Sequence, residues 1–322
     1  MMSIDAEAIA DRRRLRRKLS FWRVAGLAGL IAAVAALGYA AADRAGYGGV
    51  QEQVARISVG GVITGNQRLA DLMERVGEAK SVSGVVISIN SPGGTTTGSE
   101  ELYRNIRRLA EKKPLVAFVD GTAASGGYIT AIASDYIVAR ETALVGSVGV
   151  LIQFPDLSGL LGQVGVKVEE VKSSPLKAEP SPFKPPSPEG RAALQQVVDD
   201  TYVWFKTLVR ERRRLNEAEL ESASTGQVFS GRQSVPMKLV DRIGGERDAI
   251  AWLEQEKGVR KNLPVRDWKP RSDSDFSVFA MAAMGADLLG FEGAADALRR
   301  TAANARAVQL DGLLAVWQPL EK

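Results

Sequence analysis

The chain has 322 residues, and 45% hydrophobic with 25% charged residues is the composition of a globular protein. Its net charge of +4 comes from the N-terminus: residues 1–23 hold seven of the 42 basic and three of the 38 acidic side chains, so the remaining 35 of each sign cancel. A neutral body argues against nucleic-acid binding, which needs a basic surface. The absence of cysteine and histidine excludes disulfides, thiolate nucleophiles, the Ser-His-Asp triad and zinc sites built on these residues. Hydrolytic chemistry would have to use carboxylates, hydroxyls, lysine or backbone groups, and we expect no cofactor and no metal.

Residues 24–42, VAGLAGLIAAVAALGYAAA, form an uncharged stretch that comes after the basic run RRRLRRK and Trp22. As a helix these nineteen residues would be about 28 Å long, close to the thickness of the bilayer core. The basic flank predicts a cytoplasmic tail at 1–23, a transmembrane signal anchor at 24–42 and export of the remaining chain to the periplasmic or extracellular side. The small residues at 39–42 leave a cleaved signal peptide as the alternative.

The next hundred residues alternate between strand and helix patterns. We expect strands at 54–63, 84–90, 114–120 and 136–139, and helices at 67–80, 97–112 and 128–134. Short apolar runs that alternate with helices are typical of βαβ units and a mainly parallel sheet. Two glycine-rich segments, SPGG and TAASGGY, each come directly after a strand, so both are predicted at the carboxyl edge of the sheet, where α/β folds place their sites.

The second half of the chain is less regular. We expect a strand at 163–171, helices at 192–215 and 247–255, and short elements between 226 and 245. Residues 175–188 hold six prolines, which predicts an irregular loop there. The exported domain is assigned to 43–257. Residues 258–322 form a C-terminal extension of unknown role, with amphipathic helices expected at 276–289 and 294–307.

The segment TAASGGY raises the question of whether Ser125 is a nucleophile or part of an ordinary glycine turn. A serine at a strand-to-helix turn points out of the end of the sheet, and the unpaired amides of the following helix favour an oxyanion beside it. Gly126 removes the side chain that would block this approach, and the glycines of SPGG can turn a second amide toward the site. Two such loops at adjacent strand ends favour a functional site.

Without histidine, lysine is the natural base for such a serine. The pKa of a lysine, about 10.4 in water, must fall toward neutrality, which requires apolar surroundings away from carboxylates. Lys172 has Glu169 and Glu170 beside it in the sequence, which would keep it charged. Lys177 and Lys184, in the proline-rich segment, both remain candidates.

Four motifs in this order resemble the signal peptide peptidase A (protease IV) family: INSPGG at 89–94, AASGGY at 123–128, GSVGV at 146–150 and KSSPLK at 172–177. The resemblance runs from about residue 54 to 255 and includes GQVFSGRQS and LVDRIGG between 226 and 245. Three features depart from the family pattern: the lysine segment is richer in proline, Ser234 stands where a small apolar residue is usual, and residues 258–322 lie outside the match.

This resemblance implies a crotonase-like α/β fold of repeated ββα units, related to the Clp protease proteolytic subunit, and a Ser-Lys dyad. The positions that match the family's site are Ser125 as nucleophile, Lys177 as general base, Gly94, Gly93 and Gly126 as the oxyanion hole, and Ser147 as the residue that orients the lysine. It also implies a homo-oligomeric ring in which the serine of one subunit meets the lysine of its neighbour.

We therefore expect a membrane-anchored serine endopeptidase that digests cleaved signal peptides and other apolar peptides at the bilayer. One alternative is a same-fold peptidase that acts on a regulatory membrane protein, and another is a catalytically silent scaffold that binds peptides. A crotonase-type acyl-CoA enzyme is disfavoured, because an exported domain would not meet its cofactor.

Overall fold

The computed structural model describes residues 51–270 and 314–316, with four single positions nearer the N-terminus (18, 21, 22 and 29). The chain divides into two compact units, Met1–Glu52 and Gln53–Lys322, and the sheet with its helices belongs to the second unit. None of the helices within the described residues has the length and apolar character needed to cross a membrane. The anchor predicted at 24–42 lies outside the described residues, except for Gly29.

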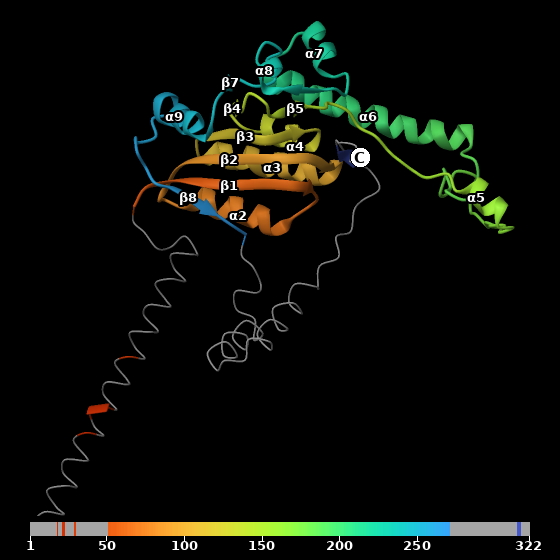
Figure 1. The fold of residues 1–322 in the computed structure, drawn as a ribbon, viewed down its shortest axis with the longest axis horizontal. Coiled ribbons are helices and arrows are strands. Elements are labelled where there is room, and N and C mark those ends of the chain that lie inside the picture. Colours follow the sequence, from red (N-terminus) through yellow and green to blue (C-terminus); the bar gives the residue numbers. More distant parts are fainter. Residues whose placement is uncertain (1–17, 19–20, 23–28, 30–50, 271–313, 317–322) are drawn as a thin grey trace, which may run out of the picture. The chain divides into compact units, whose positions relative to one another are not determined.

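The second unit is built on a mixed α/β sheet (Figure 1). The strands are β1 Gln53–Ile63, β2 Val82–Thr95, β3 Leu115–Ala124, β4 Tyr136–Ala139, β5 Leu144–Gly146, β6 Val228–Ser230, β7 Arg242–Ile243, β8 Val265–Trp268 and β9 Leu314–Val316. The helices are α2 Gln67–Glu78, α3 Thr96–Lys112, α4 Gly126–Ile132, α5 Ser158–Gln163, α6 Pro188–Arg213, α7 Glu217–Ala223, α8 Gly231–Ser234 and α9 Glu246–Glu256. The alternation predicted from the sequence is confirmed for the first seven elements.

The strand order is β6-β5-β3-β2-β1-β8, with β4 paired to β3 and β7, and β9 paired to β2. Pairing is parallel except for β5 with β6 and β2 with β9, which are antiparallel. β3 pairs with β4 along its first half and with β5 along its second half. The carboxyl ends of β1, β2, β3 and β5 therefore meet at one edge, which positions the glycine-rich segments together.

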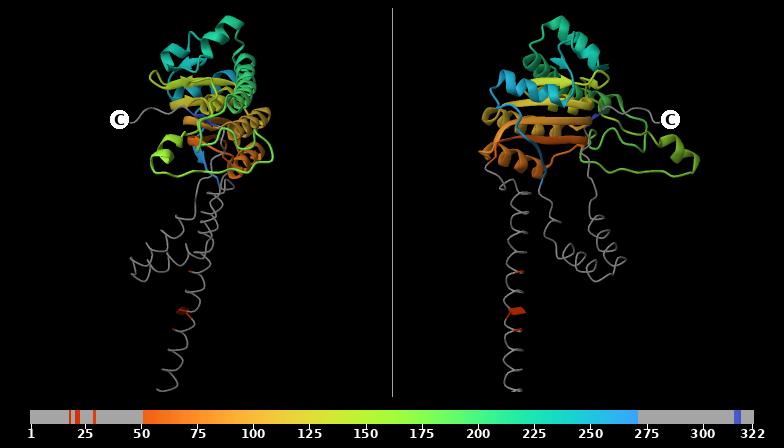
Figure 2. Two further views of the ribbon diagram at one scale, coloured as in Figure 1. Left: turned by 90° about the vertical axis from the view of Figure 1, so that its right-hand side faces the viewer. Right: turned by 60° about the vertical axis from the view of Figure 1, so that its left-hand side comes forward.

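Alternate residues of each central strand face opposite sides of the sheet. On β2, Val85, Ile87 and Ile89 pack in the larger core with α2, α3, α4 and α6. Val86 lies in a second core on the other face, with α9. Figure 2 shows the helices on both sides of the sheet. Burial on both faces explains why the central strands read as continuous apolar runs rather than alternating ones.

The sequence expectations fail at the strand ends and in the region before α6. β2 and β3 continue beyond 90 and 120 through the glycine-rich segments, because neighbouring strands pair with them there. Residues 164–171 form no strand: the pattern of valines is strand-like, but a strand needs a hydrogen-bonding partner along its edge. Residues 175–187 hold no helix or strand, as their prolines predicted. The helices expected at 276–289 and 294–307 lie outside the described residues.

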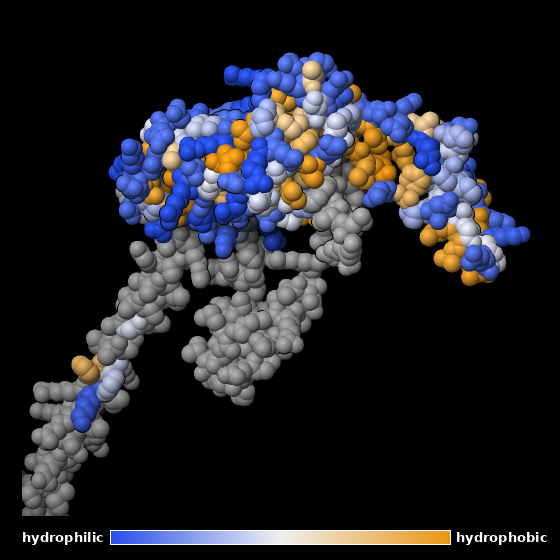
Figure 3. All heavy atoms as spheres, turned by 45° about the horizontal axis from the view of Figure 1, so that its top comes forward, coloured by the Kyte–Doolittle hydropathy of each residue, from blue (hydrophilic) through white to orange (hydrophobic). Residues whose placement is uncertain are grey.

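We call residues 151–187, between β5 and α6, the arm. It extends away from the sheet together with the first half of α6 (Figure 1). Figure 3 shows apolar residues gathered along it. The large apolar side chains exposed on the arm are those of Leu151, Leu157, Leu160, Val164, Val166, Val168, Val171, Leu176 and Phe183. An apolar surface of this extent is typical of an interaction surface.

Candidate active site

Ser125 lies at the turn from β3 into α4 and is only 2% exposed. Its backbone has φ 52° and ψ −116°, a conformation that non-glycine residues rarely adopt. Its amide donates to the carbonyl of Gly146 at 2.8 Å, and its own carbonyl accepts from the amides of Tyr128 and Ile129. These hydrogen bonds hold the strained turn in place on both sides.

Gly126, the first residue of α4, packs directly against the end of β2. A Cβ atom at this position would lie 2.2 Å from the Ser99 hydroxyl oxygen, 3.1 Å from the Gly94 nitrogen and 3.3 Å from the Gly93 Cα. Only glycine fits so close a contact. The amide of Gly94 is therefore a close neighbour of the residue that comes after Ser125, as an oxyanion hole made from two chain segments requires.

The segment around Gly94 is fixed by β1. Gly93 has φ 111° and pairs with Val62, while Gly94 pairs with Ile63 after a shift in register. A Cβ atom on Gly94 would lie 1.7 Å from the Ile63 carbonyl oxygen, so no other residue can replace it without moving the strand. Gly93 and Gly94 thus form a rigid end to β2 rather than a loose glycine loop.

Ser147 is linked to Ser125 through its neighbour Gly146, whose carbonyl accepts the Ser125 amide. Ser147 is also nearly buried and also has positive φ, 53°. Its own amide donates to the carbonyl of Gln227 at 2.7 Å, which ties β5 to the segment before β6. The predicted lysine-orienting serine therefore comes directly after the strand that supports the predicted nucleophile.

Helix α4 is anchored at its far end by the larger core. The Tyr128 hydroxyl donates to the carbonyl of Leu239 at 2.9 Å, and full burial raises the pKa of this phenol. The guanidinium of Arg212, on α6, donates to the carbonyls of Ile132 and Ser134, both at 2.8 Å. The two Arg212 bonds satisfy carbonyl groups at and just after the C-terminal end of α4, and together with the Tyr128 bond they hold the helix that begins beside Ser125.

The predicted lysines all lie on the arm. Lys172 donates to Glu170 at 2.7 Å and to Glu179 at 2.6 Å, and these hydrogen bonds, that to Glu170 first, raise the pKa of its ammonium. Lys184 pairs with the same two carboxylates. The Lys177 side chain is exposed and makes no hydrogen bond or ion pair within the described part of the chain.

The structure thus brings Ser125, Gly126, Gly93 and Gly94 together. Ser147 comes directly after Gly146, whose carbonyl accepts the hydrogen bond of the Ser125 amide. Within the described part of the chain, no hydrogen bond or ion pair joins Lys177, which is exposed on the arm, to Ser125, which is nearly buried at the end of β3. No group of three metal-ligating side chains occurs among the residues that the structure describes.

Sequence reasoning missed the residues that enforce the contact between the two glycine segments. Ser99 donates to the carbonyl of Thr95 at 2.9 Å, and Thr95 caps α3 by accepting from the Gly98 amide at 3.1 Å. The cap could be predicted from the sequence, because a threonine directly before a helix commonly accepts from the amide three residues later. The contact of Ser99 with Gly126 was not, since it joins two helices whose packing only the fold determines.

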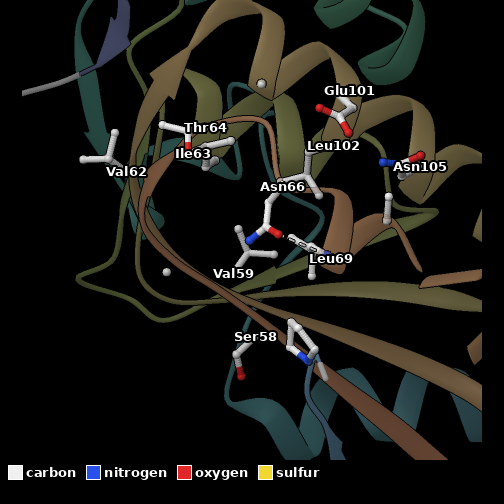
Figure 4. Close-up of a pocket in the computed structure, with 14 residues that line it drawn as sticks. Ser58, Val59, Val62, Ile63, Thr64, Asn66, Leu69, Glu101, Leu102 and Asn105 are labelled. Carbon is white, nitrogen blue, oxygen red and sulfur yellow. Dashed lines mark hydrogen bonds between the residues drawn. The ribbon is translucent and has the colours of Figure 1, made fainter. Parts of the chain in front are cut away.

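A cavity of about 170 Å³ adjoins the end of β1, between that strand and helices α2 and α3 (Figure 4). Apolar side chains, among them Val59, Ile63 and Leu102, line it together with the polar Asn66 and Glu101. Ile63 lines this cavity, and its backbone also packs against Gly94, so the cavity lies next to the end of β2.

A serine at the end of a parallel strand, with its neighbour packed against the amide of a second strand end, is the arrangement of a serine-type hydrolase. Comparisons with known proteins point the same way. Peptidase family S49 matches residues 107–260. A protein of Methanocaldococcus jannaschii named as a protease is 37% identical over 189 residues, which cover 59% of this chain and 61% of that protein.

Two further relatives carry more specific names. A protein of Enterococcus faecium named as a signal peptide peptidase, SppA, is 31% identical over 260 residues, covering 76% of this chain and 74% of that protein. Protease 4 of Haemophilus influenzae is 27% identical over 255 residues, which span 76% of this chain and only 41% of its own length. The chain belongs to peptidase family S49, the family of signal peptide peptidase A and protease 4, and is a serine-type peptidase.

Proposed function

We propose that the protein is a membrane-anchored endopeptidase in which Ser125 is the nucleophile and Lys177 the general base. The observation that carries this proposal is the strained, buried turn at Ser125, packed through Gly126 against the Gly94 amide. Strain of this kind persists only where the surroundings enforce it, and it is concentrated at functional sites.

These groups determine the chemistry. The neutral amine of Lys177 takes the proton of the Ser125 hydroxyl as its oxygen attacks the peptide carbonyl. The amides of Gly94 and Gly126 stabilise the oxyanion that forms, with Gly93 giving the strand end its shape. The protonated lysine then gives its proton to the leaving amine, which leaves an acyl-serine. The same lysine activates the water molecule that hydrolyses this ester.

The choice of Lys177 over Lys184 is supported by the ion pairs of the arm. The ammonium groups of Lys172 and Lys184 are already engaged by Glu170 and Glu179. A general base must instead be desolvated among apolar groups and away from carboxylates. Because Lys177 is exposed on an apolar arm, we assign its partner serine to a neighbouring copy of the chain in a homo-oligomeric ring, with Ser147 of the receiving subunit orienting the lysine.

The substrates that we propose are apolar peptides, such as cleaved signal peptides, met at the cytoplasmic membrane. The uncharged stretch at 24–42 would anchor the chain with its N-terminus in the cytoplasm and the peptidase domain exported. The name of the Enterococcus relative supports this substrate class. The expected fold type is crotonase-like, related to the Clp protease proteolytic subunit.

Hydrolysis of a fluorogenic apolar peptide by the full chain tests the proposal, with Ser125→Ala, Lys177→Ala and, as the matched control on the same arm, Lys184→Ala. We expect the first two variants to lose activity by a factor on the order of 10³ or more, as removal of a nucleophile or its base does in serine hydrolases. Lys184→Ala should keep most of its activity.

Two results would overturn this assignment. Activity that survives Lys177→Ala but not Lys184→Ala would move the base to Lys184. A wild-type chain that neither cuts peptides nor reacts with a fluorophosphonate at Ser125 would favour the catalytically silent scaffold.

A further inference from the structure

Ser91, on β2, is a fully buried hydroxyl that the mechanism above does not use. Its oxygen lies 2.6 Å from the Gly61 carbonyl oxygen and 3.1 Å from the Gly93 nitrogen. A hydroxyl has one hydrogen to donate and can also accept. Ser91 therefore donates to the nearer Gly61 carbonyl and accepts from the Gly93 amide, while the Gly93 carbonyl, at 3.5 Å, is a longer contact.

These two hydrogen bonds lie where the ladder between β1 and β2 is interrupted. The register shifts between Gly60 and Val62, where Ser91 and Pro92 of β2 stand opposite the single residue Gly61 of β1. Such a bulge leaves backbone groups without their regular partners, and a proline has no amide hydrogen to donate. The Ser91 hydroxyl supplies the donor that Gly61 receives, so a side chain takes the place of a missing backbone bond.

The same residue is fixed against the segment that carries the candidate nucleophile. Ser91 pairs with Ala123 of β3, two residues before Ser125. A Cβ atom on Gly127, in the first turn of α4, would lie 2.5 Å from the Ser91 carbonyl oxygen and 3.4 Å from the Ser91 Cβ. Ser91 thus contacts β1, β3 and α4, and through its hydroxyl it holds the amide of Gly93 relative to all three.

We infer that Ser91 is a positioning residue of the peptidase, whose hydroxyl holds the Gly93 amide so that the next amide, that of Gly94, is aimed at the oxyanion. The inference rests on the proposed function. Gly93 has φ 111°, and a glycine restricts the orientation of its peptide groups less than any other residue, so this orientation has to be imposed from outside. Because the Gly93 amide is engaged by Ser91, the donor that β2 offers to the oxyanion is Gly94.

This role has a kinetic signature. The oxyanion exists in the transition state and not in the bound substrate, so a badly aimed donor lowers kcat and leaves KM nearly unchanged. Complete removal of one oxyanion donor costs on the order of 10²–10³ in kcat. Loss of the Ser91 hydroxyl leaves the Gly94 amide in place but poorly aimed, so we expect a smaller loss, of about tenfold or more.

The test is Ser91→Ala in the full chain, with a fluorogenic apolar peptide as substrate. We expect kcat to fall by about tenfold or more and KM to stay within about twofold of the wild-type value. Ser91→Cys should show the same change, because a thiol keeps the size of the side chain but is only a weak donor and acceptor. This second variant separates the lost hydrogen bonds from a packing defect, and it decides the test if Ser91→Ala does not fold.

Ser234→Ala is the matched control. Ser234 is also a fully buried serine whose hydroxyl donates to a backbone carbonyl, that of Ser230 at 2.8 Å, but it lies on α8. Its kcat and KM should both stay within about twofold of the wild-type values.

Hydrogen exchange tests the structural part of the inference without catalysis. In the Ser125→Ala background, adding Ser91→Ala should speed exchange of the Gly93 amide by about tenfold, the factor that the loss of one hydrogen bond supplies. The amide of Ile87, in the uninterrupted part of the sheet, should exchange at an unchanged rate.

Three results would overturn the inference: Gly93 exchange that does not respond to Ser91→Ala, a kcat that neither Ser91 variant lowers, or a loss that appears in KM instead. A loss of equal size in Ser234→Ala would do the same, since it would show a general sensitivity to buried serines. Failure of the proposed function looks different: neither the wild type nor any variant hydrolyses peptide, and a fluorophosphonate does not label Ser125.

Discussion

At the scale of single residues, the site depends on two turns that carry positive φ. Ser125 and Ser147 each hold a conformation that costs on the order of 1–3 kcal/mol, and the Gly146 carbonyl connects them through its bond to the Ser125 amide. Main-chain hydrogen bonds to fixed strands support both turns. The strained conformation aims the serine without any flexible side chain having to be ordered.

The contact between Gly126 and Ser99 gives the sharpest residue-scale prediction. Gly126→Ala would place a Cβ atom 2.2 Å from the Ser99 hydroxyl oxygen and 3.1 Å from the Gly94 nitrogen, so α4 and the end of β2 must move apart. We expect kcat/KM for peptide hydrolysis to fall by a factor on the order of 10² or more, because displacement of about 1 Å at a reacting centre has such effects.

A second substitution tests whether that contact is the cause. Ser99→Ala removes the hydroxyl with the worst overlap, and alone it should lose no more than about fivefold in kcat/KM, because only the hydrogen bond to the Thr95 carbonyl is lost. Combined with Gly126→Ala, it should restore a measurable part of the activity, which is the coupling expected of residues in direct contact. Losses that simply add would show that the defect of Gly126→Ala has another origin.

At the scale of elements, the arm is organised by a cluster of four charges. Glu170 accepts from Lys172 and from the Ser181 hydroxyl, and these hydrogen bonds, that of Lys172 first, lower the pKa of the Glu170 carboxyl from 4.5 to about 2. Lys184 adds a longer contact at 3.3 Å to the same carboxylate. These ion pairs join residues 170–172 to residues 179–184 and so shape the loop that contains Lys177.

The pH dependence of this cluster has a definite sign. A depressed carboxyl pKa stabilises the folded arm fully above the ordinary carboxyl pKa, near 4.5, and that stabilisation is lost as pH falls through about 2. We expect the NMR titration of the Glu170 side-chain carboxyl to have its midpoint near pH 2. In Lys172→Met, which removes the largest cause, the midpoint should rise toward 4.5, whereas Lys167→Met, a lysine outside the cluster, should leave it unchanged. An unaltered midpoint in Lys172→Met would show that the ion pair is not formed in solution.

The elements also show how far sequence can reach. The buried strands and the helices between them were predictable, because apolar runs and helical periodicity record burial directly. Residues 164–171 were not: their valines alternate as in a strand, yet a strand forms only where a partner edge exists, and periodicity says nothing of partners. The same limitation hid β9, whose three residues pair with an edge more than two hundred positions earlier in the chain.

The candidate site divides in the same way. The sequence alone made Ser125 and the glycines candidates, since a nucleophile turn and a close backbone approach leave residue-level signals. It left Lys177 and Lys184 undecided, because Glu179 stands close to both in the sequence and only the folded arm shows that it engages Lys184, together with the more distant Glu170. Ser99 carried no signal for the same reason.

At the scale of the whole molecule, the two residues that we propose as nucleophile and base lie on different parts of the chain, and no hydrogen bond joins them within the described residues. The body carries the buried Ser125, and the arm carries the exposed Lys177 on a surface rich in exposed apolar side chains. Covering such a surface with a second copy would remove apolar area from water and desolvate the lysine, which is what a lysine general base requires. Assembly and activation of the base would then be one event.

Mixing two inactive variants tests this directly. If the site is shared in a ring, a 1:1 mixture of Ser125→Ala and Lys177→Ala contains sites that combine an intact serine from one subunit with an intact lysine from the next. With random assembly each requirement is met half of the time, so activity should recover to about a quarter of the wild-type value per subunit, as expected for a head-to-tail interface.

Mixtures of either variant with the double variant Ser125→Ala/Lys177→Ala should recover nothing, because neither mixture contains both an intact Ser125 and an intact Lys177. Native mass spectrometry of isotope-labelled subunits shows whether mixed oligomers have formed. Mixed oligomers without activity would place both catalytic residues of each site in one chain, and the arm would then have to fold back toward its own sheet for Lys177 to reach Ser125.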